Sequence, residues 1–165
     1  MSTTVRLSIG IGYDSHRMVR GRPCILGGVR FEHPFGPAGH SDGDALLHAV
    51  CDAVLGACGL PDIGAQFPDT DPAFRGADSA VLARRVMRKV RAAGFSVGSL
   101  DAVVVCDAPR IGPRVPQLRR QLAALFDCRA VNVKGKTTEG AHPRMVEVYA
   151  TALVVRRNST RRKGA

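Results

Sequence analysis

The sequence predicts an α+β domain in which helices pack on one face of a mixed β-sheet. Residues 5–13 alternate apolar side chains with other residues, and this period of two is typical of a strand. Residues 79–93 place apolar side chains at i, i+4 and i+8, which is the spacing of an amphipathic helix. The expected elements begin with strands and continue as two helices, a strand, a helix and two final strands. That order favours helices layered on one sheet.

Before the first long loop, the sequence predicts a further β region and a helix. Residues 24–31 form the β region, and the Gly27-Gly28 pair within it is either a turn or a bulge. Residues 45–58 are mostly apolar and are expected to be helical. Ser41 and Asp44 precede this helix at a spacing of three, which resembles a capping box.

The second half of the chain is expected to alternate helices with apolar strands. Residues 79–93 form a helix that ends before Gly94. The remaining elements are a strand over 100–106, a helix marked by Leu118, Leu122 and Leu125, and strands over 130–134 and 145–155. Segments rich in Pro, Gly and Asp are expected to be loops, and they cover 34–39, 61–76 and 109–116. The 61–76 loop is long for a simple connection, which favours a functional role.

Length and composition indicate one soluble domain. A chain of 165 residues fits a single domain over residues 1–157, followed by a basic tail over 158–165 that we expect to be disordered. The chain has no apolar run approaching the ~20 residues of a membrane span and no signal-like apolar core after Met1. We therefore expect a cytoplasmic protein with no membrane partner.

The net charge of +10 raises nucleic acid as a partner, but the charge distribution weakens that interpretation. Five of the positive charges lie in the last ten residues, and +5 remains without them. The chain has six Phe, two Tyr and no Trp, so it has few aromatic groups on which bases could stack. We expect nucleic-acid binding to be absent and the basic residues to be solvated.

An aspartate and two histidines are candidate metal ligands. Asp14 and His16 are two residues apart in an extended segment, so their side chains point the same way. His48 lies on the helix over 45–58, and Asp44 or Asp52 could hold its second ring nitrogen from one turn away. Two imidazoles and a carboxylate suit Zn²⁺ with one open position. Each residue alone also fits an ordinary surface or turn role, and spacing alone does not bring His48 to the other two.

Two further polar clusters could contact phosphates or a second ion. The 61–76 loop carries acidic residues whose pattern is also that of ordinary turns. Residues 134–140 combine lysines, hydroxyls and Glu139 at a strand end, which suits phosphate oxygens and Mg²⁺ but equally a polar turn. The pattern of a P-loop is absent from this segment.

These segments together resemble the 2-C-methyl-D-erythritol 2,4-cyclodiphosphate synthase family over residues 9–155. The motifs that carry the resemblance are Gly12-Tyr13-Asp14-Ser15-His16, Leu26-Gly27-Gly28-Val29, His40-Ser41-Asp42-Gly43-Asp44 through His48, Asp62-Ile63-Gly64, Phe67-Pro68-Asp69-Thr70-Asp71-Pro72, Ala108-Pro109-Arg110 and Lys136-Thr137-Thr138-Glu139. Their order and spacing in combination are specific to this family, although no single motif is.

The resemblance implies a role for each matching position. Asp14, His16 and His48 match Zn²⁺ ligands, and Glu139 matches a ligand of Mg²⁺ or Mn²⁺ bound with the substrate phosphates. His40 and Thr137 match positions that stabilise the transition state. The substrate-contacting positions that the resemblance implies are Asp14, Ser15, His16, His40, Ser41, Asp62, Ile63, Gly64, Phe67, Pro68, Asp69, Thr70, Asp71, Cys106, Asp107, Ala108, Pro109, Arg110, Ile111, Gly112, Lys136, Thr137, Thr138 and Glu139.

The resemblance also implies the reaction and the assembly. The expected enzyme, a phosphorus–oxygen lyase, cyclises 4-diphosphocytidyl-2-C-methyl-D-erythritol 2-phosphate by intramolecular phosphoryl transfer and releases CMP. The expected assembly is a homotrimer with the uncovered sheet faces inward and active sites between subunits. Residues 140–145 are shorter than in many members, so no residue is assigned to a ligand of the central cavity. The alternatives are a basic nucleic-acid-binding protein and another metal-dependent phosphohydrolase.

Overall fold

The structure is a computed structural model that describes residues 5–74 and 76–156. The prediction of a disordered tail over 158–165 falls outside these residues. None of the helices in the described ranges is long and apolar enough to cross a membrane.

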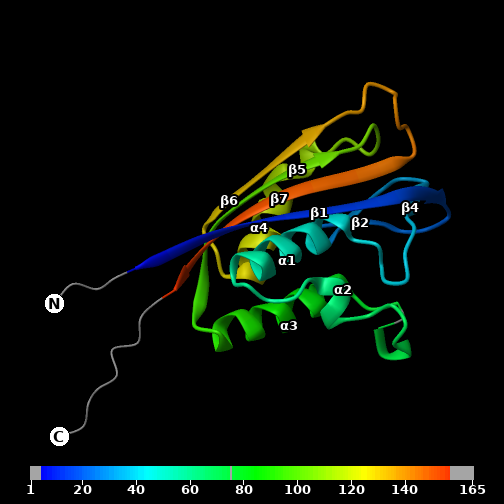
Figure 1. Cartoon of the computed structure of the whole chain (residues 1–165). Coiled ribbons are helices and arrows are strands. Elements are labelled where there is room, and N and C mark those ends of the chain that lie inside the picture. The colour runs from blue at the N-terminus through cyan, green and yellow to red at the C-terminus, as the bar shows by residue number, and fades with distance from the viewer. Residues whose placement is uncertain (1–4, 75, 157–165) are drawn as a thin grey trace, which may run out of the picture.

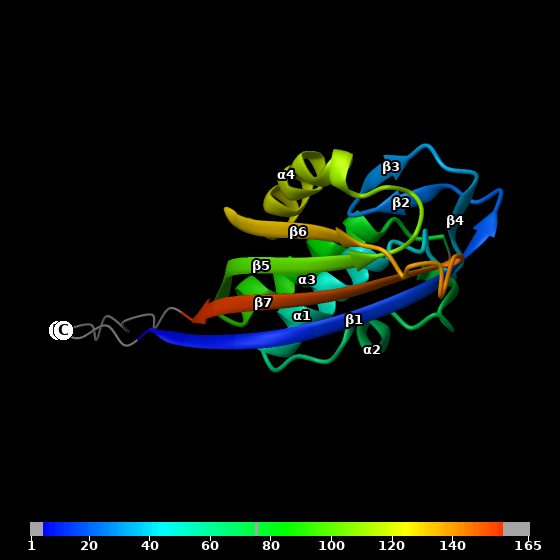
Figure 2. The ribbon, with the colours of Figure 1, turned by 90° about the horizontal axis from the view of Figure 1, so that it is seen from above.

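A five-stranded mixed sheet forms the centre of the fold. Its strands lie in the order β4 (Phe35–Pro37), β1 (Arg6–Arg20), β7 (Met145–Arg156), β5 (Phe95–Val105) and β6 (Ala130–Lys136). The β5–β6 pair is parallel, whereas the other three pairs are antiparallel. Figure 2 shows β1, β7, β5 and β6 side by side across the open face of the sheet. The predicted mixed sheet is therefore confirmed.

Three long helices cover the opposite face of the sheet (Figure 1). They are α1 (Ala45–Ala57), α3 (Ser79–Ala92) and α4 (Val115–Phe126), and each overlaps a helix that the apolar spacing predicts. The predicted inward-facing residues of α3 and α4 are buried, and they are Leu82, Val86, Val90, Leu118, Leu122 and Leu125. Burial of these side chains holds the helices on the sheet.

Glycines let α1 lie directly on β1. A methyl group at Gly10 or Gly12 would overlap backbone atoms of α1, including the carbonyl oxygens of Ala53 and Ala49 respectively. The apolar residues that alternate with these glycines face away from the helices, and Ile9 is 80% exposed in the single chain. The period-two pattern thus places its apolar side chains on the open face and its small residues against the helix.

Three local predictions differ from the structure. The first strand continues through 14–20 because it pairs with β7 as far as Arg17 and with β4 from Met18. The segment over 34–39 contains β4, an edge strand, and is not only a loop. The 61–76 segment contains the short helix α2 (Ile63–Gln66) and a 3₁₀ turn, because its Asp and Pro residues cap and start helical turns.

The β region over 24–31 and the start of α1 are joined through one buried carboxylate. Gly27 and Gly28 both have positive φ, so the pair is the turn of a hairpin between β2 (Cys24–Leu26) and β3 (Val29–Phe31). Asp44, not Ser41, caps α1 and accepts from the backbone N–H of Leu47. Its oxygens also accept from the N–H groups of Gly27 and Gly28 at 2.7 and 2.6 Å. The expected capping box is therefore wrong.

Candidate active site

Asp14, His16 and His48 converge on one point. Asp14 Oδ2 lies 3.0 Å from His16 Nε2 and 2.9 Å from His48 Nδ1, and the candidate ligand atoms all lie within 4.8 Å of one another. Among the described residues, this is the one group of three or more His, Cys, Asp or Glu side chains close enough to share an ion. The contact between His48 and the other two residues, which spacing left open, is therefore present.

The chemistry of this cluster fits a divalent metal ion. His16 Nε2 is buried and makes no hydrogen bond, despite its short distance to Asp14. Burying a ring nitrogen without a hydrogen-bond partner destabilises the folded chain unless a ligand binds to that nitrogen. Burial acts to raise the pKa of Asp14, but the neighbouring His16 and His48 outweigh it and hold the pKa below its usual range. Asp14 therefore stays ionised, as a metal ligand must be.

Local structure explains why these three side chains meet. Asp14 and His16 lie within β1, so the pleat directs both toward the same face. His48 lies in the first turn of α1, and the glycine contacts above bring that helix against β1. The cluster therefore depends on the packing of α1 on β1.

Ser79 holds the second ring nitrogen of His48. Its Oγ lies 2.9 Å from His48 Nε2, and its hydroxyl donates to Asp42 Oδ1. Burial acts to lower the pKa of His48, but the hydrogen bond with Asp14 outweighs it and raises the pKa above the usual value.

The prediction that Asp44 or Asp52 holds the second nitrogen of His48 is wrong. Asp44 is the helix cap and faces the β2–β3 turn, so the one-turn spacing within a helix does not apply to it. Asp52 instead accepts from the backbone N–H of Ile63 at 2.7 Å and fastens α2 to α1.

The metal-ligand cluster opens into a cavity of about 500 Å³. Its lining includes Gly39, Phe74 and Leu82 together with ten of the predicted site residues, namely Asp14, His16, His40, Ser41, His48, Ile63, Gly64, Phe67, Pro68 and Asp69. Four other predicted residues, Ser15, Asp62, Thr70 and Asp71, are outside this lining. Asp62 caps α2 through the N–H of Ala65, and Asp71 accepts from the N–H of Ala73. These two carboxylates shape the loop that forms one wall.

A second cavity of about 570 Å³ lies between the ends of β5 and β6 and the loop that follows β5. The predicted residues in its lining are Cys106, Asp107, Arg110, Ile111, Gly112, Lys136 and Thr137, whereas Ala108, Pro109, Thr138 and Glu139 are outside it. The two strands are parallel, so their ends meet at the same edge of the sheet. Two cationic side chains, Arg110 and Lys136, give this cavity the charge that an anionic ligand requires.

Asp107 fixes the loop after β6. Its oxygens accept from the backbone N–H and the hydroxyl of Thr138, each at 2.7 Å. These hydrogen bonds from Thr138 hold the pKa of Asp107 below its usual range, and the bond from the Thr138 hydroxyl contributes most. Thr137 donates to Glu139 Oε1 at 3.0 Å, and Glu139 has a positive φ of 54°. The neighbours Thr137 and Glu139 are therefore held in one compact turn.

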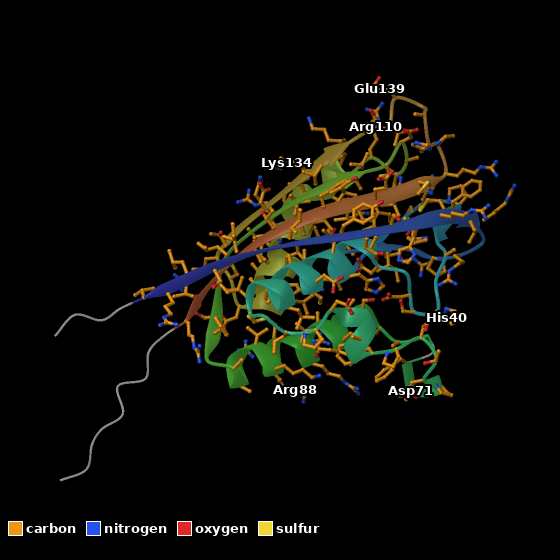
Figure 3. All side chains as sticks on the ribbon, in the orientation of Figure 1. His40, Asp71, Arg88, Arg110, Lys134 and Glu139 are labelled. Atoms are coloured by element: carbon orange, nitrogen blue, oxygen red, sulfur yellow. The ribbon has the colours of Figure 1, made fainter. Side chains whose placement is uncertain are left out.

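The two cavities of one chain are separate. Figure 3 shows His40 and Glu139 at distant edges of the molecule, with the sheet between them. The predicted residues thus form two groups, one beside the metal cluster and one beside the β5 and β6 ends. His40 and Thr137 are not brought together within a single chain.

Sequence reasoning missed the contact of Ser79 with His48. The sequence pattern marks Ser79 only as the first residue of a helix, and a serine in that position is ordinary. No spacing rule connects two residues 31 positions apart. The burial of a polar side chain, which the structure reveals, is the signal that marks Ser79.

Comparisons with known proteins identify the family of this chain. The 2-C-methyl-D-erythritol 2,4-cyclodiphosphate synthase of Bordetella avium is 54% identical over 139 residues, which cover 83% of this chain and 86% of that protein. The enzyme of the same name from Ralstonia nicotianae is 54% identical over 153 residues, which cover 90% and 91%. A solved synthase of this kind in its CDP-bound form is 42% identical with a TM-score of 0.84, covering 88% of this chain and 99% of the other. Residues 7–155 match the family model itself, and the chain therefore belongs to the YgbB family.

Proposed function

We propose that the chain converts 4-diphosphocytidyl-2-C-methyl-D-erythritol 2-phosphate to 2-C-methyl-D-erythritol 2,4-cyclodiphosphate and CMP. An oxygen of the 2-phosphate forms a bond to the β-phosphorus. The bond from that phosphorus to the oxygen of the α-phosphate breaks, and CMP leaves with the electron pair. The observation that carries this proposal is the convergence of Asp14, His16 and His48 in a chain 54% identical to synthases of this name.

Asp14, His16 and His48 would hold Zn²⁺ or a similar ion, and Glu139 would contribute to Mg²⁺ or Mn²⁺ bound with the phosphates. Divalent ions supply charge neutralisation and Lewis acidity to a transferring phosphoryl group. The orphaned nitrogen of His16 and the ionised Asp14 support the first site. Support for the second is the exposed Glu139 carboxylate beside the second cavity.

The protein's own residues would hold the folded substrate at both ends. His40 and Ser41 line the wall beside the metal cluster, where a diphosphate would lie. Residues 63–69, which form one wall of this cavity, would enclose the methylerythritol part of the substrate, and Phe67 would supply the apolar surface of that wall. Holding the nucleophilic phosphate against the β-phosphorus supplies a proximity advantage that reaches roughly 7–11 kcal/mol in favourable cases.

The second cavity would hold the cytidine monophosphate part. Cys106 through Gly112 would present backbone groups to the base, and Lys136 through Glu139 would close over the phosphates. Thr137, held beside Glu139, would donate a hydrogen bond to the charge that develops on the phosphates. The CDP in the solved relative supports a nucleotide of this class.

A homotrimer would complete each site. The open sheet face carries exposed apolar side chains on β1, namely Leu7, Ile9 and Ile11. A contiguous apolar surface of this kind is typical of a protein interface. The separation of His40 from Glu139 in one chain also favours a site in which two subunits each contribute one cavity.

Phosphorus NMR of the products tests the proposed reaction. The purified chain is incubated with the cytidine diphosphate substrate, Zn²⁺ and Mg²⁺ in ¹⁸O-labelled water. We expect CMP and a cyclic diphosphate in equal amounts, with no ¹⁸O in either product. Incorporation of ¹⁸O would indicate a hydrolase instead, and an unchanged substrate would contradict the proposed activity.

A further inference from the structure

Ser79 is an unusual residue for the interior of this domain. It is 1% exposed, and Ser79 and Asp44 are the two buried polar or charged residues in the described ranges. Asp44 is explained by its three backbone hydrogen bonds. Ser79 is the first residue of α3, but Asp78, not Ser79, caps that helix through the N–H of Ala80. A helix cap therefore does not account for the Ser79 hydroxyl.

The hydrogen bonds around Ser79 have a defined direction. An ionised carboxylate only accepts hydrogen bonds, so the Ser79 hydroxyl proton points to Asp42 Oδ1 at 2.5 Å. Asp42 Oδ2 also accepts from the backbone N–H of Ser79 at 2.9 Å, which fixes both groups. With its proton committed to Asp42, Ser79 Oγ offers a lone pair to His48 Nε2 at 2.9 Å. His48 Nε2 must then carry a proton.

We propose that Asp42 and Ser79 are positioning residues that fix the Nε2–H tautomer of His48 and so present its Nδ1 lone pair to the metal ion. This inference rests on the proposed metal site and extends it. His48 Nδ1 is the ring atom that faces Asp14, at 2.9 Å, so without an ion it donates to that carboxylate. A bound ion would displace this proton, while Nε2 keeps its own. A neutral imidazole has only one lone-pair nitrogen, so the side on which the proton sits decides which nitrogen can be a ligand.

The nearby Ser41 hydroxyl does not substitute for Ser79. Its Oγ lies 3.4 Å from His48 Nε2, farther than Ser79 Oγ, and it also accepts from the backbone N–H of Gly43. The described hydrogen bonds connect no carboxylate to the Ser41 hydroxyl, so its proton has no fixed direction. Ser79 is therefore the group through which Asp42 acts on His48.

The test measures Zn²⁺ affinity by competition with a chelator in the full-length chain. Removal of a hydrogen-bond partner behind a ligating histidine typically costs about 10–100-fold in metal affinity. We expect Ser79→Ala to bind Zn²⁺ about 10-fold more weakly, and Ser79→Thr, which restores the hydroxyl, to recover most of that loss. Asp78→Ala is the matched control, because it weakens the start of α3 without touching the hydrogen bonds of Ser79 Oγ.

A second variant covers the case in which Thr does not fit or Ser79→Ala does not fold. Asp42→Ala removes the carboxylate that accepts the Ser79 hydroxyl proton, so that this proton is free to turn toward His48. We expect this variant also to bind Zn²⁺ more weakly. Equal affinity of Asp42→Ala and the unsubstituted chain would overturn the proposal, as would a loss in Asp78→Ala as large as in Ser79→Ala.

Nitrogen-15 NMR of the imidazoles supplies a readout besides affinity. In the Zn²⁺-loaded chain we expect His48 to be bound through Nδ1 with a protonated Nε2, and Ser79→Ala should add rings that are bound through Nε2. Coordination through His48 Nε2 in the unsubstituted chain would overturn the proposal. Failure of the unsubstituted chain to bind any Zn²⁺ would instead reject the metal site, and the positioning role with it.

Discussion

Gly12 controls the distance between the two elements that carry the metal ligands. β1 holds Asp14 and His16, and α1 holds His48. A methyl group at Gly12 would overlap the Ala49 carbonyl oxygen and lie 2.7 Å from the backbone nitrogen of Ala53. Both obstacles are helix backbone, so no flexible side chain can move away. The Gly12→Ala substitution must therefore push α1 off β1.

The size of this movement can be worked out from the contacts. Ordinary Cβ contacts begin at 3.4 Å, so the contact with the Ala53 nitrogen alone requires a shift of 0.7 Å. Metal sites tolerate deviations of about 0.2 Å in ligand distance. Overpacking a well-packed interior costs about 1–3 kcal/mol in the free energy of unfolding. We therefore expect Gly12→Ala both to destabilise the fold and to weaken Zn²⁺ binding.

Thermal unfolding and Zn²⁺ titration of Gly12→Ala measure the two effects together. Gly56→Ala is the control, because a methyl group at Gly56 of α1 would meet only the Ile11 carbonyl oxygen at 4.0 Å. Replacing a glycine inside a helix by alanine is stabilising by roughly 0.5–1 kcal/mol. The reasoning is refuted if Gly12→Ala unfolds at the same temperature as the unsubstituted chain and binds Zn²⁺ as tightly.

Four further substitutions test separate parts of the site. His48→Ala should lose the bound ion and nearly all turnover, and metal analysis showing full occupancy would count against its role. Thr137→Ala should lower kcat more than it raises KM; a rise in KM alone would contradict a transition-state role. Ile9→Glu should leave the chain folded but prevent assembly, because Ile9 is 80% exposed in one chain; sedimentation showing an intact trimer would exclude this face. Asp107→Asn should weaken CMP binding in calorimetry. Because the pKa of Asp107 is lowered, its stabilisation of the 136–139 turn is fully present above the unfolded value of 3.8 and is lost as pH falls through the lower pKa of the folded chain. The protection of the Thr138 amide, relative to the exchange rate of an unstructured amide at the same pH, should therefore fall in acid for the unsubstituted chain and not for Asp107→Asn.

The helices could be predicted because their burial follows a local pattern. The spacing of Leu82, Val86 and Val90 locates α3, since one face of a helix in contact with a sheet requires this period. The length of β1 could not be predicted, because its continuation depends on pairing with β7 and β4. The pattern also did not decide which side of β1 meets the helices, since alternation defines two faces without assigning them.

In the candidate site, too, the contacts between residues close in the sequence could be predicted, and the contacts between distant residues could not. Asp14 and His16 follow from the two-residue period of a strand. His48 joins them only through the tertiary contact of α1 with β1, so its place was implied by family resemblance and not by spacing. Asp44 shows the limit of helical spacing, because a residue at the cap lies outside the regular helix and turns to other partners.

Anomalous diffraction at the zinc edge, from crystals of the chain grown with Zn²⁺, tests the shared ligand set most directly. We predict one strong peak per chain within about 2.0–2.2 Å of an Asp14 oxygen, His16 Nε2 and His48 Nδ1. A peak that lacks any of these three ligands, or a fully loaded crystal with no peak between β1 and α1, would contradict the metal centre on which the proposed reaction depends.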